Sequence, residues 1–278
     1  ALVALALFLS FRVLNIADMT TDGTFTLGCA VSATVAVAGH PLLALPAAML
    51  AGACAGSVTA LLQTKLKIPS ILAGILTQLM LYSVNLVILG GKSLLAIDPR
   101  ANPLLVHMSN NIPSIVVMAV VVTMTIISLW LFFYTEIGLT LKSTGDNPDM
   151  SRAQGVNVDR NKVIGLAIAN GIVALAGALL AQQQGAAEIN RGRGAIVIGL
   201  AAIIIGEVMC PQLVTNFAIR LLCVAGGALI YWFVFQTVVF LGLPSELLKM
   251  LSAIVEQAPY KPRWGIFIFT NEEEELMH

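Results

Sequence analysis

Charged residues are scarce in this chain of 278 residues, where Asp, Glu, Lys and Arg together make up 11%. Soluble globular proteins carry about 25%. The formal net charge is zero, so the composition offers no basic excess for nucleic acid, and we expect no nucleic acid partner. This scarcity of charge favours a protein that lies in a lipid bilayer.

Metal-ligand and catalytic patterns are missing as well. The four cysteines lie in or beside apolar segments without the spacing of a metal site: Cys29, Cys54, Cys210 and Cys223. The sequence contains no Gly-x-Ser-x-Gly motif and no neighbouring set of Ser, His and acid. We therefore expect no metal, no cofactor and no enzymatic activity in this chain.

Apolar residues are abundant instead, at 58% of the chain with a mean hydropathy of +0.90. A bilayer-spanning helix needs about 20 apolar residues. Runs near or above this length occupy 42–64, 70–89, 113–134, 162–184 and 214–241, and shorter runs occupy 1–14, 25–38 and 195–208. The pattern predicts an all-α, polytopic transmembrane helical bundle with about eight membrane segments in a single domain, residues 1–278. Residues 244–278 add a short helix and an acidic tail.

Two polar stretches, residues 16–23 and 182–194, each precede a short apolar run. They predict discontinuous helices, because non-helical backbone at membrane depth is tolerated only where it lines a cavity or is buried in protein. We expect polar side chains of these stretches to line a substrate path: Asp18, Thr21, Asp22, Glu188 and Asn190. The alternative is that the acidic residues cap helices at the membrane surface.

A polar stripe also occurs within the apolar run at 70–89. Gln78, Tyr82 and Asn85 are spaced by four and three residues, which places them on one helical face. A polar stripe on a membrane helix points inward, toward a pathway or toward a neighbouring helix. We include the three residues in the candidate substrate path, with bonding between helices as the alternative.

The chain is organised around a polar segment at residues 135–161, which we call the coupling segment. Gly145 is expected to break the preceding helix, and Asp146 or Asn147 to cap a new short one. Pro148 suits the first turn of that helix, and Gly155 suits a left-handed stop after it. This chemistry predicts an ordered element on the membrane surface, followed by a long apolar helix at 162–184.

The coupling segment and the helix after it carry a family resemblance. The residues concerned are Gly138, Gly145-Asp146-Asn147, Met150, Ala153, Gly155-Val156, Lys162, Asn170-Gly171, Ala174, Gly177-Ala178-Leu179 and Gln182. The resemblance continues through Gly185, Asn190, Gly192, Gly194, Ile198-Gly199-Leu200-Ala201 and Ile204-Ile205-Gly206-Glu207. With these residues the chain resembles permeases of bacterial ABC importers, in the ribose and branched-chain amino-acid permease superfamily. It is most similar to the tryptophan/tyrosine subgroup that depends on a binding protein, although Arg191 and Arg193 depart from the apolar residues usual there.

The resemblance implies a multi-pass permease in the bacterial plasma (inner) membrane that works as a homodimer. Separate ABC ATPase subunits would hydrolyse ATP, and an extracellular or periplasmic substrate-binding protein would deliver an amino acid, aromatic ones included, or a related small molecule. The residues that match the ATPase-coupling element are Gly145, Asp146, Asn147, Met150, Ala153 and Gly155. The alternative function is an ion-coupled secondary transporter or channel, in which Asp18, Asp22 or Glu188 would serve the ion.

Basic residues predict the orientation. With the coupling segment in the cytoplasm, the inner side holds Arg12, Lys65, Lys67, Lys142, Arg152, Arg160, Lys162 and Arg220. The outer side then holds Lys92, Arg100, Arg191 and Arg193. This excess of basic residues on the inside agrees with the positive-inside rule.

Overall fold

The computed structural model describes residues 1–97, 111–209 and 217–240, and the regular elements among them are helices apart from two three-residue strands. The first helices are α1 (Leu2–Leu7), the π-helix η1 (Phe8–Val13), α2 (Thr21–Val37), α3 (Pro41–Lys65) and α4 (Ser70–Ile88). They are followed by β1 (Leu94–Ala96), α5 (Asn111–Tyr134), α6 (Glu136–Asp146), α7 (Pro148–Ala153) and α8 (Val158–Gln184). The last described elements are β2 (Ala186–Glu188), α9 (Ala195–Met209) and α10 (Phe217–Phe240).

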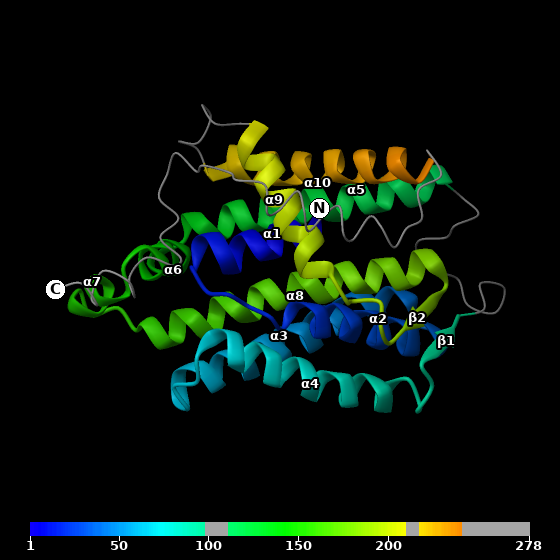
Figure 1. The fold of residues 1–278 in the computed structure, drawn as a ribbon, viewed down its shortest axis with the longest axis horizontal. Helices are drawn as coiled ribbons and strands as arrows, with labels where there is room; N and C mark the ends of the chain where they lie inside the picture. The colour runs from blue at the N-terminus through cyan, green and yellow to red at the C-terminus, as the bar shows by residue number, and fades with distance from the viewer. Residues whose placement is uncertain (98–110, 210–216, 241–278) are drawn as a thin grey trace.

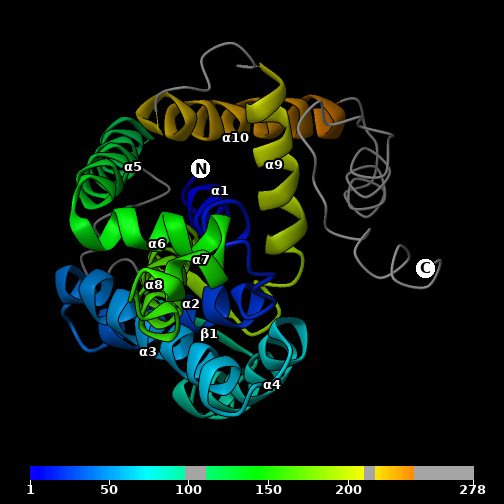
Figure 2. The same cartoon turned by 90° about the vertical axis from the view of Figure 1, so that its left-hand side faces the viewer.

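The helices form layers on either side of α8 (Figure 1). Helices α2 and α3 pack against one side of α8, and α4 covers them from outside. On the other side lie α1 and the obliquely crossing α9, with α5 and α10 beyond them (Figure 2). Helices α6 and α7 project at one end of the bundle, and β1 and β2 pair at the other.

Small residues let the central helices approach to backbone contact. A Cβ added to Gly28 would overlap the backbone of Ala174 in α8, and one added to Gly56 would overlap the carbonyl oxygen of Leu166. Gly52 meets the side chain of Ala174 in the same way. The Gly52-x-x-x-Gly56 pair therefore packs α3 onto α8 inside this chain, as small residues do in membrane helices.

The all-α membrane fold is confirmed. Among the described residues, five helices are long and apolar enough to cross a membrane: α3, α4, α5 from Ser114 to Tyr134, α8, and α10 from Phe217 to Thr237. Two shorter apolar helices accompany them, Leu2–Val13 and Ala195–Met209. The total of about eight segments stays a prediction.

Two helix starts differ from the expected ones. Helix α2 begins at Thr21 instead of Phe25, so Thr21 and Asp22 belong to its first turn, and the first break comprises residues 14–20. Helix α8 begins at Val158 instead of Lys162, because the side chain of Asn157 accepts a hydrogen bond from the backbone N–H of Arg160 at 3.0 Å. The cap adds a full turn to the helix.

The connection between the apolar runs at 70–89 and 113–134 contains a strand that the sequence pattern did not indicate. Strand β1 pairs antiparallel with β2, and Leu95 lies opposite Ala187. Strand β2 belongs to the second break, residues 185–194, which separates α8 from α9. The expected helix and tail at 244–278, and Arg100, lie outside the described residues.

Candidate functional site

The coupling segment folds into a short capped helix, α7. The side-chain oxygen of Asn147 accepts hydrogen bonds from the backbone N–H groups of Asp149, at 3.1 Å, and Met150, at 3.0 Å. Pro148 occupies the first position of the helix, where no N–H donor is needed. Of the two caps considered, Asn147 is the one used, and Asp146 is the last residue of α6.

The end of α7 is a left-handed glycine. Gly155 has a φ of +83° and no atom within 4 Å of an added Cβ. Its N–H and that of Val156 donate to the carbonyls of Arg152 and Ser151, which closes the helix. The predicted stop is therefore confirmed. Glycine is favoured at this position because of its positive φ, and a side chain would meet no steric obstacle there.

Helix α7 is exposed at its tip and anchored at its base. The Met150 side chain is 60% exposed, and Ala153 is exposed beside it. The hydroxyl of buried Ser151 donates to the Asn147 carbonyl at 2.9 Å and reaches Ser143 of α6 at 3.4 Å. Helix α7 thus projects from one end of the bundle (Figure 1), and it carries an exposed apolar side chain.

The expectation that Gly145 breaks a helix is wrong. Gly145 lies inside α6, which continues to Asp146. A Cβ at this position would overlap the carbonyl oxygen of Val13 and come within 3.0 Å of the Leu14 Cα. The glycine is there because α6 touches the backbone at the end of η1.

The first break is closed by a buried polar network. The Asp18 carboxylate is 1% exposed and accepts hydrogen bonds from the Thr20 N–H at 2.9 Å and the Asn170 side-chain N–H at 2.6 Å. Thr24 donates to the Asn170 side-chain oxygen at 2.8 Å, and the hydroxyls of Thr20 and Thr59 lie 3.0 Å apart. Since Asn170 lies near the middle of the 27-residue α8, the break lies deep in the bundle.

Asp22 holds the start of α9. Its carboxylate accepts hydrogen bonds from the backbone N–H groups of Gly194, at 3.0 Å, and Ile196, at 3.1 Å. The Gly192 N–H donates to the Thr26 hydroxyl at 3.2 Å. The carboxylate faces the positive end of α9, which stabilises its charge. Asp22 therefore caps α9 within the bundle, whereas Asp18 joins the first break to α8 through Asn170.

Two further buried polar side chains, one on α2 and one on α4, lie beside the first break. The Thr21 hydroxyl donates to the Asp18 carbonyl at 3.3 Å. The Asn85 side chain of α4 donates to the Gly23 carbonyl at 3.3 Å, while its buried oxygen has no hydrogen-bond partner among the described residues. The structure thus brings Asn85 to the residues that follow the break.

The other members of the candidate path are dispersed. Gln78 is half-buried on α4, whereas Tyr82 is 46% exposed on its outer surface. Glu188 lies at the end of β2, 3.8 Å from Arg191, and Asn190 is exposed in the turn that follows. The predicted common face of α4 is therefore divided between the bundle and its surface.

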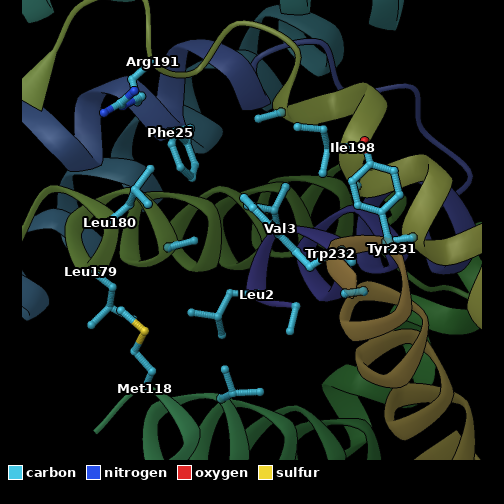
Figure 3. A pocket seen from close by; sticks show the side chains of 18 of the residues that line it. Leu2, Val3, Phe25, Met118, Leu179, Leu180, Arg191, Ile198, Tyr231 and Trp232 are labelled. Carbon is cyan, nitrogen blue, oxygen red and sulfur yellow. The ribbon is translucent and has the colours of Figure 1, made fainter. Parts of the chain in front are cut away.

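A cavity of about 460 Å³ lies between α1, α8, α9 and α10 (Figure 3). Its walls are mostly apolar, with Leu2 and Val3 on one side and Tyr231 and Trp232 on another. Arg191 and Arg193 also line it. None of the eight candidate path residues belongs to its lining, so the cavity and the polar network are separate features of the molecule.

Sequence reasoning missed two long-range contacts. Asn170 was noticed only within the resemblance, and an isolated amide among small residues in the middle of a membrane span was the available signal. Arg12 forms a bidentate ion pair with Glu207, with nitrogen–oxygen distances of 2.6 and 2.9 Å. The only signal for this pair was that each charge ends a short apolar run.

Comparison with known proteins gives consistent matches. Residues 1–255 match the family described as the permease component of branched-chain amino acid transport systems. The chain is 36% identical over 257 residues to the tyrosine transport system permease protein of Clostridioides difficile (strain R20291), covering 92% of this chain and 84% of that protein. It is 34% identical over 263 residues to an uncharacterized protein of Rickettsia prowazekii (strain Madrid E), covering 90% and 89%.

A more distant match is to a permease of a different import system. The chain is 28% identical over 194 residues to the autoinducer 2 import system permease protein LsrC of Yersinia pseudotuberculosis (serotype O:1b, strain IP 31758), covering 70% of this chain and 54% of that protein. No solved structure matches the chain.

Proposed function

This chain belongs to the family of permease components of branched-chain amino acid transport systems, and we propose that it couples transport to a separate ATPase through α7. It is a multi-pass inner-membrane protein. The observation that carries the proposal is the construction of the coupling segment: a helix capped by Asn147, stopped by Gly155 and exposed at Met150. Such an element fits a groove of a partner as a rigid body.

The anchoring of α7 supports force transmission. Ser151 bonds α7 to α6, and the Asn161 side chain donates to the Thr144 hydroxyl at 2.9 Å, which bonds α8 to α6. A push on Met150 would therefore move α6 and the start of α8 together. A flexible linker would absorb the same push.

Two glycine variants test docking. Gly155 and Gly39 both have positive φ, +83° and +89°, and open space around an added Cβ. Valine at either position costs about 1–2 kcal/mol in backbone strain, but Gly39 lies between α2 and α3, at the other end of the bundle. We expect Gly155→Val to lose co-purification with the ATPase subunits while Gly39→Val retains it. Equal ATPase association in the two variants would contradict docking through α7.

We propose an amino acid as the substrate, with tyrosine as the first candidate. The support is the 36% identity, over 92% of this chain, to a protein named for tyrosine transport. Uptake of labelled tyrosine by cells that express the whole system should fall with excess unlabelled tyrosine or tryptophan, but not with ribose. Competition by ribose alone would favour a sugar-like substrate instead. Uptake that collapses with a protonophore while ATP is maintained would favour the ion-coupled alternative.

The substrate path proposed here keeps the eight candidate residues and runs past the first break: Asp18, Thr21, Asp22, Gln78, Tyr82, Asn85, Glu188 and Asn190. Its support is the depth of the polar network beside Asn170 and the side-chain oxygen of Asn85, which has no hydrogen-bond partner in the part of the chain that the structure describes. Exposed Tyr82 would meet the path if a second copy packs on α4. We propose such a homodimer because α4 leaves large apolar side chains uncovered, including Leu79 at 64% and Val87 at 77% exposure. Native mass spectrometry of the purified permease would detect it.

A further inference from the structure

Helix α9 is fastened at both ends to the stretch of chain around the first break. At its start, the Asp22 carboxylate holds the N–H groups of Gly194 and Ile196. At its other end, Glu207 is paired with Arg12 of η1 through both carboxylate oxygens. Since Arg12 and Asp22 flank the break, a displacement of η1 reaches α9 through the ion pair.

Helix α9 also rests directly on α1 between these two attachments. A Cβ added to Gly199 would overlap the Leu7 side chain and come within 3.2 Å of Val3. The glycine lets the side chains of Leu7 and Val3 pack directly against the backbone of α9. The attachments at the two ends of α9 therefore determine whether α9 moves together with α1 and η1 or independently of them.

The coupling segment packs against the end of η1 that carries Arg12. Gly145 of α6 meets the backbone of Val13 and Leu14, the residues that follow Arg12. Fully buried Leu141 of α6 packs near Leu14 on the same side, since an added Cβ at Gly165 would contact both side chains. A movement of α6 would therefore press on the backbone beside Arg12, without a soft side chain in between.

The two attachments of α9 differ in kind. The Asp22 end uses backbone N–H donors and is partly buried. The Arg12–Glu207 end is formed by side chains that are 38% and 27% exposed. Ion pairs with such access to water contribute little to stability and re-form readily, whereas their bidentate geometry fixes orientation. This combination suits a contact that opens and closes.

We infer that the Arg12–Glu207 ion pair links the coupling segment to α9 and opens during the transport cycle, while the Asp22 end acts as the hinge. The inference rests on the proposed docking of an ATPase at α7 and adds the route by which docking reaches the second break. Arg12 and Glu207 are positioning residues: they act on the path by setting the angle of α9.

Charge variants in the assembled complex test the link. Arg12→Gln or Glu207→Gln should leave ATPase co-purification unchanged, while hydrolysis stimulated by the binding protein falls at least ~5-fold relative to unstimulated hydrolysis, the lower end for coupling between sites. The exchange Arg12→Glu with Glu207→Arg should restore stimulation. The control is Arg220→Gln, which removes an exposed basic residue of α10 that makes no ion pair with the described residues; it should leave the ratio unchanged. Normal stimulation in both single variants would overturn the inference.

A cross-link tests the opening itself and does not depend on the exchange variant folding. In a background without the native cysteines, Arg12→Cys with Glu207→Cys should keep only the reduced uptake of the charge variants while its thiols are free. Oxidation should abolish this remaining uptake, and reduction should restore it. Full uptake by the completely cross-linked protein would overturn the inference. The two proposals fail differently: normal stimulation in the charge variants leaves docking intact, whereas an unmodified chain that binds no ATPase refutes docking and this route with it.

Discussion

The coupling segment and the first break are both polar interruptions of an apolar chain, but they are stabilised in opposite ways. In the coupling segment, Asn147 bonds to residues two and three positions further on. In the first break, Asp18 bonds to Asn170, which is 152 positions away. The hydrogen bonds of the coupling segment form between residues close in the sequence. Those of the first break form only when α2, α3 and α8 have packed together. A substitution in the coupling segment should therefore destabilise that segment alone. A substitution in the first break should also destabilise the packing of α2, α3 and α8.

The largest effect is expected from Asn170→Leu. The change keeps a similar volume but removes the donor to Asp18 and the acceptor for Thr24. A buried polar group left without its hydrogen-bond partner costs about 1–3 kcal/mol. Two groups lose a partner here, so we expect the free energy of unfolding in detergent to fall by about 3 kcal/mol. Thr59→Val is the graded comparison, since it removes the contact with Thr20 and a bond to the Ala55 carbonyl of its own helix and should cost about 1 kcal/mol. Equal, small effects in both variants would mean that the network does not hold the break together.

A middle effect is expected from Asp22→Ala, because it removes the cap of α9 at both Gly194 and Ile196. Loss of an N-cap costs about 0.5–2 kcal/mol, and uptake should fall as the second break loses its attachment. Asp22→Asn keeps a capping oxygen without the charge, so it separates capping from charge. Asn190→Ala removes an exposed side chain of the same break and should leave stability unchanged. Wild-type uptake in Asp22→Ala would mean that transport needs neither the cap that Asp22 provides for α9 nor its charge.

The same contrast explains what the sequence could predict. The cap at Asn147 and the stop at Gly155 were predictable because their partners lie within five residues. The five long spans were predictable from their apolar length. Gly145 was misread because its reason for being glycine is Val13, which lies far away in the sequence. The partners of Asp18 and Arg12 could not be inferred, since a polar residue in an apolar run does not reveal which distant helix it meets.

The smallest effect is expected from Asn147→Ala, which removes the cap of α7 and nothing from the bundle. The loss of about 1 kcal/mol should fall on α7 alone, because Pro148 still favours the first turn and Ser151 still bonds to Ser143. Amide hydrogen exchange of residues 150–154 should accelerate about 5-fold, given that 1.4 kcal/mol is tenfold, while exchange in α8 stays unchanged. Asn147→Asp, which keeps a capping oxygen, should exchange like the wild type. If Asn147→Ala instead accelerated exchange throughout α6 and α8, the coupling segment would not be closed by its own neighbours, and its difference from the first break would disappear.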